Sequence, residues 1–128
     1  MSILVDSSVW IEFFRGNANF SFISNLIVSN AICTNDIILA ELVPSVIFRK
    51  EYKLAELLKN ILKTQLIIDW QEICDIQLNN LRHGNNNIGI SDIIIAQNCI
   101  QNDCKLLSND KHFIAMAKYI PIDIFSGT

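Results

Sequence analysis

The sequence predicts a three-layer α/β/α sandwich built on a central, mainly parallel sheet of five strands. Three observations lead to this fold class. First, five short apolar runs are spread over the 128 residues. Second, these runs are too apolar for strands with one face in water. Third, helical patterns fill the gaps between them. An alternation of strand, helix and strand with gaps of this size implies right-handed crossovers and parallel strands.

The predicted strands are short and bounded by polar residues or turns, as expected for buried parallel strands. Along the chain they are Ile3–Val5, Ala31–Thr34, Gln65–Ile68, Lys105–Ser108 and Ile122–Ile124.

The gaps between these strands carry helical patterns, and Pro121 ends the last of them. The polar loop Gly84–Asn87 joins the two helices of the third gap. In chain order the predicted helices are Ser7–Phe14, Phe20–Ser29, Asp36 to about Phe48, Glu51–Leu62, Trp70–Arg82, Ser91–Asn102 and Lys111–Tyr119.

The composition favours a globular protein, which we expect to form a single domain over residues 1–128. With 51% hydrophobic and 18% charged residues, disorder is excluded. No apolar run approaches the roughly 18 residues that a membrane span requires, so no membrane partner is expected. The first ten residues include Asp6 and no basic residue, which argues against a secretory signal. The four cysteines form neither a CxxC pair nor a zinc pattern, so we expect reduced thiols and a cytoplasmic location.

The net charge of −3 does not exclude a nucleic-acid partner. If four of the thirteen Asp and Glu residues bind a metal ion, nine acids remain against ten Lys and Arg. The remaining surface is then slightly positive, and the bound ion reverses the sign of the site.

Acidic residues recur where the predicted strands end. Asp6 directly follows the first strand, Asp110 follows the fourth, and Asp92 opens a helix. Parallel strands bring their carboxyl ends to one edge of the sheet, where ligands of such folds usually bind. Each of these residues could instead be a helix N-cap, worth about 1 kcal/mol. For Asp36, which also follows a strand, capping is the preferred interpretation.

Glu41 does not fit the capping interpretation. It lies well inside its predicted helix, and no Lys or Arg occurs within seven residues on either side. Its apolar neighbours suggest a half-buried carboxylate, which costs several kcal/mol unless a cation lies opposite it. Arg49 and Lys50 are the nearest cationic side chains, and a metal ion is an equally good partner.

Four carboxylates converging on one sheet edge form an arrangement suited to Mg²⁺ or Mn²⁺, which prefer oxygen ligands. At this point the chain resembles the PIN-domain nucleases, and among them the VapC-type toxins of bacterial toxin–antitoxin pairs. The similar segments are ILVDSSVWIEFFRG, NDIILAELV, GISDIIIAQNC and LLSNDKHF, in this order and over nearly the whole chain.

The resemblance implies a role for each matching position. Asp6, Glu41, Asp92 and Asp110 match the catalytic, metal-binding acids of the family. Ser7 and Ser108 match its hydroxyl positions, which orient the first and last acids. Some members carry a further acid at position 112, where this chain has His112.

The family further implies an Mg²⁺-dependent endoribonuclease in which Mn²⁺ substitutes, with RNA as substrate. It also implies a cognate antitoxin protein as partner, and a homodimer. The apolar Trp10, Phe13 and Phe14 and the stretch Ile93–Ala96 fit either core or dimer packing.

Two other functions remain as alternatives. A non-catalytic PIN-like module would only bind a protein partner. A receiver domain would use Asp69, in QLIIDW, as its phosphoacceptor, but it leaves Glu41 and Asp92 unexplained. His83 and His112 could act as general bases, yet both are better interpreted as solvated histidines near helix ends.

Overall fold

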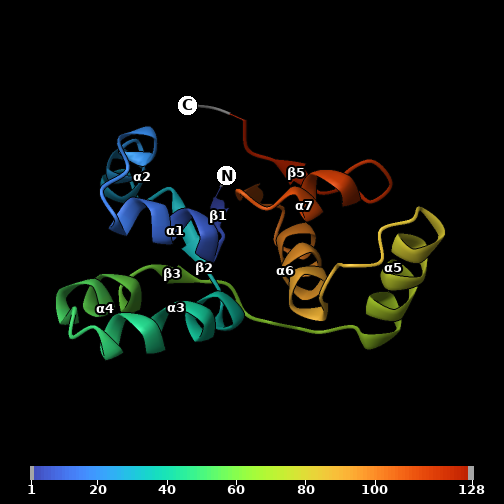
Figure 1. Cartoon of the computed structure of the whole chain (residues 1–128), viewed down its shortest axis with the longest axis horizontal. Helices are drawn as coiled ribbons and strands as arrows, with labels where there is room; N and C mark the ends of the chain where they lie inside the picture. Colours follow the sequence, from blue (N-terminus) through green and yellow to red (C-terminus); the bar gives the residue numbers. More distant parts are fainter. Residues whose placement is uncertain (1, 127–128) are drawn as a thin grey trace.

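The computed structural model describes residues 2–126, over which helices and strands alternate as the sequence predicts (Figure 1). In chain order the elements are β1 (Ile3–Val5), α1 (Ser7–Phe14), the 3₁₀ turn η1 (Ala18–Phe20), α2 (Ile23–Val28), β2 (Ile32–Thr34), α3 (Asp36–Phe48), α4 (Tyr52–Lys59), β3 (Leu62–Lys63), α5 (Trp70–Arg82), α6 (Ile90–Gln101), β4 (Lys105–Leu107), α7 (Lys111–Met116) and β5 (Asp123–Ile124).

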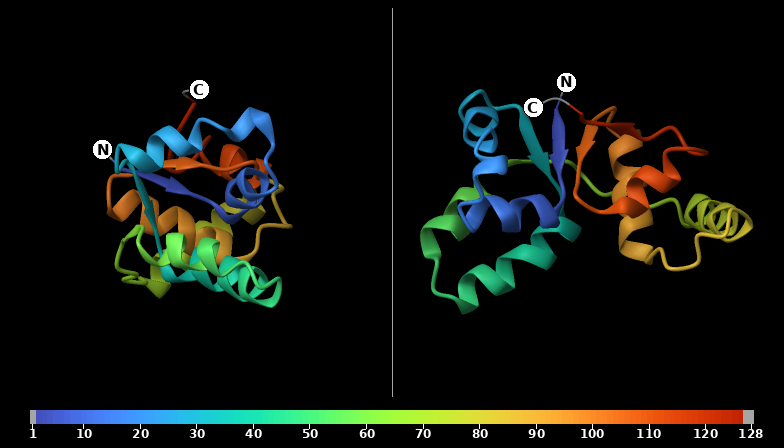
Figure 2. Two further views of the ribbon diagram at one scale, coloured as in Figure 1. Left: turned by 90° about the vertical axis from the view of Figure 1, so that its left-hand side faces the viewer. Right: turned by 45° about the horizontal axis from the view of Figure 1, so that its top comes forward.

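The five strands form one sheet in the order β3-β2-β1-β4-β5, and every neighbouring pair is parallel. The expected sheet was mainly parallel, and within the described residues it is entirely so. Helices flank the sheet and complete a three-layer α/β/α sandwich (Figure 2). Because the chain runs outward from β1 to β3 and then returns to β4 on the other side of β1, the ends of β1 and β4 lie side by side. Ligands of such sheets bind at this reversal of strand order.

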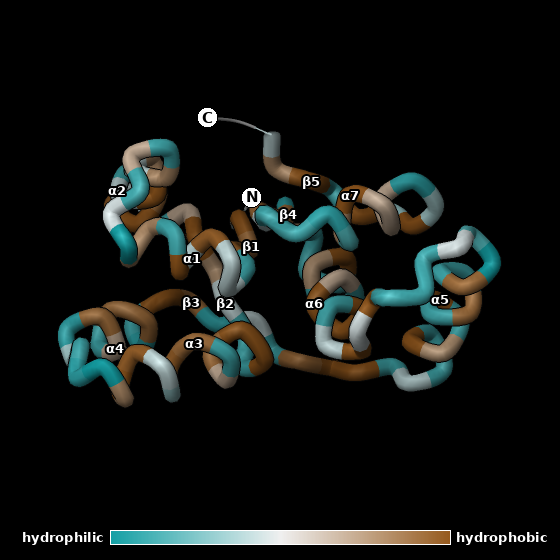
Figure 3. Tube along the Cα trace, viewed as in Figure 1, coloured by the Kyte–Doolittle hydropathy of each residue, from teal (hydrophilic) through white to brown (hydrophobic). Residues whose placement is uncertain are grey.

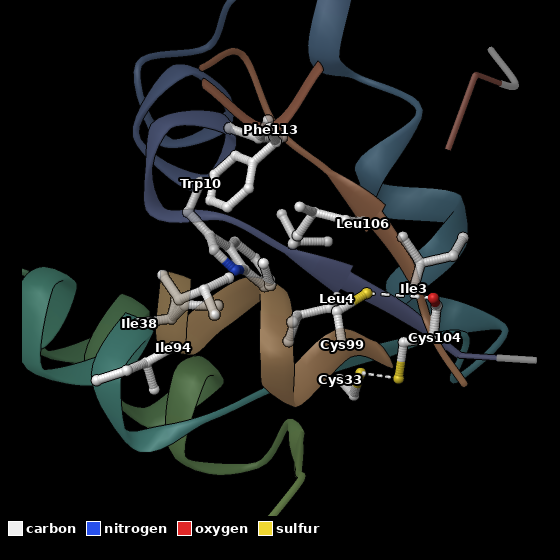
Figure 4. Close-up of a cluster of buried hydrophobic side chains, with 14 of the residues drawn as sticks. Ile3, Leu4, Trp10, Cys33, Ile38, Ile94, Cys99, Cys104, Leu106 and Phe113 are labelled. Atoms are coloured by element: carbon white, nitrogen blue, oxygen red, sulfur yellow. Dashed lines mark hydrogen bonds between the residues drawn. The ribbon is translucent and has the colours of Figure 1, made fainter. Parts of the chain in front are cut away.

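The core lies around β1, β4 and α6. In Figure 3 the segment that leads from β3 to α5 is largely hydrophobic, whereas the segment joining α5 to α6 is hydrophilic. Leu4, Trp10, Leu106 and Phe113 are fully or almost fully buried there and pack together in Figure 4. All four residues from Ile93 to Ala96 are buried as well. Trp10 and this stretch therefore pack inside the chain and are not free to form a dimer interface.

The cysteines carry free thiols. Cys33, Cys99 and Cys104 are buried, as their apolar surroundings suggest, and Cys74 is exposed. Burial raises the pKa of the Cys99 thiol to about 12 and that of Cys33 further still. The Cys33 and Cys99 thiols therefore stay protonated and act as small hydrophobic side chains.

The predicted strand Gln65–Ile68 is wrong: the third strand of the sheet is Leu62–Lys63, and the following residues run as an extended segment without a partner strand. Side chains of α6 satisfy the backbone of this segment instead. Asn98 Nδ2 donates to the Gln65 carbonyl (3.0 Å), and Gln101 Nε2 donates to the Ile67 carbonyl (2.9 Å).

Two buried amides of α6 complete this attachment. Gln97 Nε2 donates to the Asp69 carbonyl (3.1 Å), and the Asp69 amide donates back to Gln97 Oε1 (3.2 Å). Asn98 Oδ1 accepts from Asn35 Nδ2 (3.0 Å) and from the Thr64 hydroxyl (2.7 Å). We call Asn35, Thr64, Gln97 and Asn98 the amide cluster. It ties β2 and the segment after β3 to the middle of α6.

Three helices are shorter than predicted. The region Phe20–Ser29 divides into η1 and α2, because Asn17 caps a 3₁₀ turn by accepting from the Asn19 amide (3.1 Å). Helix α4 ends at Lys59, since the chain must extend to enter β3. Helix α7 ends at Met116, where the Tyr119 amide bonds the Met116 carbonyl (3.0 Å) in a 3₁₀-type closure.

The capping role predicted for Asp36 is also wrong. Asn35 is the N-cap of α3 and accepts from the Ile38 amide (3.0 Å). Asp36 lies in the first turn and pairs with Lys63 (3.0 Å) on an exposed surface. Asn caps a helix as well as Asp does, so the sequence alone could not decide between two adjacent candidates.

Among the described residues, no helix combines the length and the apolar character needed to cross a bilayer.

Candidate active site at the carboxyl edge of the sheet

The carboxyl ends of β1 and β4 are held together by the backbone. Val5 is in register with Leu107, and the Asp6 amide donates to the Leu107 carbonyl (2.9 Å). The residues that follow each strand, Asp6 on one side and Ser108 on the other, are therefore neighbours. A short pair of parallel strands thus fixes two of the predicted site residues next to each other.

Two hydroxyls hold the buried carboxylate of Asp6, which is only 5% exposed. Ser8 Oγ donates to Asp6 Oδ2 (3.0 Å), and Ser108 Oγ donates to the same oxygen (2.8 Å). Asp6 occupies the N-cap position of α1 but makes no side-chain capping bond. The capping alternative therefore fails for this residue, and its carboxylate is oriented by serines from two strand ends.

These serines also shape the loop after β4. Ser108 Oγ accepts from the Asp110 amide (2.9 Å), and Ser8 Oγ accepts from the Asn109 amide (3.2 Å). Ser8 was not among the predicted site residues. Its signal is its position in the sequence DSS, two residues after Asp6, where a hydroxyl at a helix start can reach back to the acid.

Glu41 approaches the same edge from α3. Ser7 Oγ donates to Glu41 Oε2 (3.3 Å), so Ser7 contacts this acid and not the neighbouring Asp6. The Glu41 side chain is exposed, where the sequence suggested half-burial, and no Lys or Arg within the described chain forms an ion pair with it. Its pKa is nevertheless raised above 4.5, chiefly because surrounding protein displaces water and also because the Asp6 carboxylate is near.

Asp92 and Asp110 come together through a histidine. Asp92 is the third residue of α6, whose N-cap is Gly89. His112 Nδ1 lies 3.2 Å from Asp92 Oδ2 and 3.4 Å from Asp110 Oδ1. Asp110 is also the N-cap of α7, accepting from the His112 amide (2.9 Å), so here the capping interpretation and the site coincide. His112 is not the solvated helix-end histidine that the sequence suggested.

The electrostatics of Asp92 tie it to the other acids. Its pKa is raised above 3.8, first by burial and then by repulsion from Asp110 and Asp6, while the hydrogen bond from His112 lowers it. The carboxylates of Asp6, Glu41, Asp92 and Asp110, which we call the acid cluster, thus repel one another across the sheet edge. Like charges in such a group are costly without a cation.

The donor atoms fit a divalent cation. Asp92, Asp110 and His112 offer ligand atoms that all lie within 4.8 Å of one another. Carboxylate oxygens suit Mg²⁺ and Mn²⁺, and two further carboxylates of the acid cluster stand nearby. A pocket of about 160 Å³, lined by residues 84–88 and His112, opens beside this group.

Asp69 lies outside the acid cluster. Its carboxylate caps α5 by accepting from the Glu72 amide (3.2 Å), and its backbone is bonded to Gln97. It therefore has a structural role at a helix start, which removes the basis for the receiver-domain alternative. His83 makes no hydrogen bond to the acid cluster within the described residues. Its ring stacks on that of Tyr119, with 4.0 Å between the ring centroids.

Solved structures with this fold span nearly the whole chain at low sequence identity. VapBC2 from Rickettsia felis, in a complex with promoter DNA, has a TM-score of 0.71 at 20% identity, covering 98% of each chain. FitAcB from Neisseria gonorrhoeae has a TM-score of 0.69 at 23% identity, covering 97% of this chain and 96% of that one. DNA-bound VapBC from Salmonella typhimurium has a TM-score of 0.67 at 18% identity, covering 98% and 97%.

A comparison with curated protein sequences finds no match. The sequence does match the PIN domain family over residues 3–119, a range that contains the whole acid cluster and both strands that position it. The chain therefore belongs to the PIN domain family.

Proposed function

We propose that this protein is a metal-dependent endoribonuclease of the VapC type, the toxin of a toxin–antitoxin pair, acting in the cytoplasm. The observation that carries the proposal is the acid cluster: four carboxylates from β1, α3, α6 and the end of β4 share one sheet edge. No Lys or Arg among the described residues pairs with any of them. Such a group is costly for the fold, and a bound cation explains why a PIN domain would retain it.

Each acid has a distinct part in holding Mg²⁺ or Mn²⁺. Asp6 is fixed by Ser8 and Ser108, so its carboxylate is oriented before any ligand arrives. Asp92 and Asp110 face each other across His112 and supply the closest group of donor atoms.

Glu41 is the most exposed member of the cluster and faces solvent, where substrate would approach. A divalent ion bound here would supply an activated water and stabilise the leaving oxygen of a phosphodiester. The carboxylates of the acid cluster would hold the ion in place for that chemistry.

Basic side chains near α1 and α3 support an RNA substrate. Arg15 and Arg49 line a small pocket of about 40 Å³ between these two helices. Lys50 and Lys53 line a wider depression just beyond the end of α3. Arg49, Lys50 and Lys53 follow the C-terminal end of α3, the helix that carries Glu41, and would meet the phosphates of a nucleic acid there.

A protein partner is the second part of this proposal. The similar structures include VapBC complexes and a toxin–antitoxin complex from Klebsiella pneumoniae, and we extend an antitoxin partner to this chain. We also propose a homodimer, but not through Trp10 or the stretch Ile93–Ala96; Phe13 and Phe14, also considered for it, are partly buried. Trp10 and Ile93–Ala96 are buried, whereas Leu78, Leu81 and Ile114 are 45–56% exposed and remain free for such a contact.

The test is cleavage of a labelled structured RNA by the purified chain. We expect cleavage in Mg²⁺ or Mn²⁺, loss of cleavage in EDTA, and recovery when either ion is restored. Asp36→Asn serves as a matched control, since Asp36 is an exposed carboxylate outside the acid cluster. A chain that neither binds Mn²⁺ in calorimetry nor cleaves RNA would instead be the non-catalytic PIN-like module.

A further inference from the structure

His112 has the position of a ligand. Its ring projects from the first turn of α7, and Nδ1 lies within 3.4 Å of carboxylate oxygens from two different elements. The backbone of the residue is itself fixed, because its amide donates to Asp110 Oδ1 (2.9 Å). Three potential donor atoms, two oxygens and one nitrogen, thus converge from α6, from the loop after β4 and from α7.

The orientation of the ring is not imposed by lack of space. The His112 side chain is 37% exposed, and the pocket beside it leaves room for the ring to turn toward solvent. Instead Nδ1 faces Asp92 and Asp110. Two interpretations fit this geometry: the imidazole is a cationic partner that occupies the place of a metal ion, or it is one of the ion's ligands. They predict opposite effects of removing it, since a competitor weakens metal binding and a ligand strengthens it.

The donor set distinguishes between metal ions. Mg²⁺ requires oxygen ligands and keeps much of its hydration, whereas imidazole nitrogen is a good ligand for transition metals. Two carboxylates with one imidazole therefore shift a site from Mg²⁺ toward Mn²⁺ relative to an all-carboxylate site. A carboxylate at position 112 would restore the all-oxygen set.

We propose that His112 Nδ1 is a direct ligand of the divalent ion held by Asp92 and Asp110, and that it gives this site a preference for Mn²⁺ over Mg²⁺. The inference rests on the metal site of the proposed function and adds the identity of one ligand and of the preferred ion. It requires no change in the role of Asp6 or Glu41.

The first experiment measures binding of Mn²⁺ and of Mg²⁺ to the intact protein by calorimetry. The variants are His112→Asp, His112→Ala and, as matched control, His83→Asn at the other histidine, whose ring stacks on Tyr119. Loss of a group that only orients a ligand costs roughly 10- to 100-fold in metal affinity, so His112→Ala should weaken Mn²⁺ binding at least about tenfold. His112→Asp should reduce the ratio of Mn²⁺ to Mg²⁺ affinity, and His83→Asn should leave it unchanged.

The second experiment detects the ligand directly. Pulsed electron paramagnetic resonance of the Mn²⁺ complex should show nitrogen modulation from a coordinated imidazole in the wild type and in His83→Asn. The modulation should disappear in His112→Asp, which still binds the ion.

The outcomes separate this inference from the proposed function. If Mn²⁺ binds without nitrogen modulation, or binds more tightly in His112→Ala, then His112 is not a ligand while the metal site itself stands. If no variant and no wild-type sample binds Mn²⁺ at all, the metal site is absent and both proposals are wrong.

Discussion

Helix α6 takes part in two polar clusters that differ in nearly every physical respect. At its start, Asp92 belongs to the acid cluster, where burial and then repulsion between the carboxylates raise the pKa of Asp92 and Glu41. In its middle, Gln97 and Asn98 belong to the amide cluster, where both side chains are at most 2% exposed and their amides are hydrogen-bonded on both sides.

The contrast separates polar groups that stabilise a fold from those that the fold tolerates. A buried amide with all its partners contributes to stability, and leaving a partner unpaired costs about 1–3 kcal/mol. A group of carboxylates without a cation reduces stability and persists where function requires it. The two clusters should therefore respond to mutation in opposite ways.

The largest effect is expected on catalysis in the acid cluster. Asp6→Asn keeps the hydroxyl contacts of Ser8 and Ser108 within reach but removes the charge that holds the ion. We expect RNA cleavage to fall by about a thousandfold, equivalent to roughly 4 kcal/mol of transition-state stabilisation. The rate is measured under single-turnover conditions in Mn²⁺.

Because the acids act as one site, combining Asp6→Asn with Asp92→Asn should be little worse than either change alone. Near wild-type cleavage by Asp6→Asn would remove the acid cluster from the mechanism.

The next largest effect is expected on stability in the amide cluster. Asn98→Leu removes the partner of the Asn35 side-chain amide and of the Gln65 carbonyl, and leaves the Thr64 hydroxyl only the Thr34 carbonyl. We expect the free energy of unfolding to fall by about 2–3 kcal/mol, as measured by urea denaturation. The control Gln101→Ala loses one exposed bond to the Ile67 carbonyl and should cost about 1 kcal/mol or less. Equal losses in both variants would contradict a special role for the buried cluster.

A smaller effect of opposite sign is expected when acids are neutralised in EDTA. The raised pKa values of Glu41 and Asp92 mean that the native state binds protons before the unfolded state does as the pH falls. The apo protein should therefore gain stability as the pH falls through these raised pKa values, until the ordinary values of 4.5 and 3.8 are passed. In the double variant Glu41→Gln/Asp92→Asn this contribution is absent, so the free energies of unfolding of wild type and variant should converge as the pH falls. If the two free energies keep a constant difference, burial and repulsion do not raise the pKa values of these acids.

The smallest effect is expected at Asp36, outside both clusters. Its contact with Lys63 is an exposed ion pair, and such pairs contribute roughly 0–1 kcal/mol. Asp36→Asn should change the free energy of unfolding by no more than about 0.5 kcal/mol and should leave RNA cleavage unchanged. A loss of cleavage in this variant would mean that the functional surface extends beyond the acid cluster.

The sequence predicts the fold well where local signals suffice. Helices Ser7–Phe14 and Trp70–Arg82 have the predicted boundaries, because their apolar spacing and start signals lie within the helix itself. The strand Gln65–Ile68 was wrong for a non-local reason. Leu66 and Ile68 do pack on the core, but carbonyls of the segment bond to side chains of α6 more than thirty residues later in the chain.

The site shows the same limit. Asp6, Asp92 and Asp110 could be expected at one edge because each follows a strand or begins a helix, and parallel strands bring such positions together. Glu41 was found by a different signal, an acid in an apolar stretch without Lys or Arg nearby. The contact of His112 with Asp92 depends on how α6 and α7 pack, which no local pattern reveals. Ser7 likewise contacts Glu41, an acid 34 residues away, and not its neighbour Asp6.

The most direct test of the contrast is thermal unfolding of the wild type and Asp92→Asn, each in EDTA and in millimolar Mn²⁺. In EDTA, Asp92→Asn should melt at a higher temperature, since the change removes a charge that is disfavoured by burial and by repulsion from Asp110 and Asp6. Mn²⁺ should raise the melting temperature of the wild type because it binds only the folded state. Each tenfold loss of Mn²⁺ affinity in the variant removes about 1.4 kcal/mol of the free energy by which the ion stabilises the folded state. If Asp92→Asn melts below the wild type in EDTA and gains as much from Mn²⁺, then the acid cluster is not a metal site held at the expense of stability.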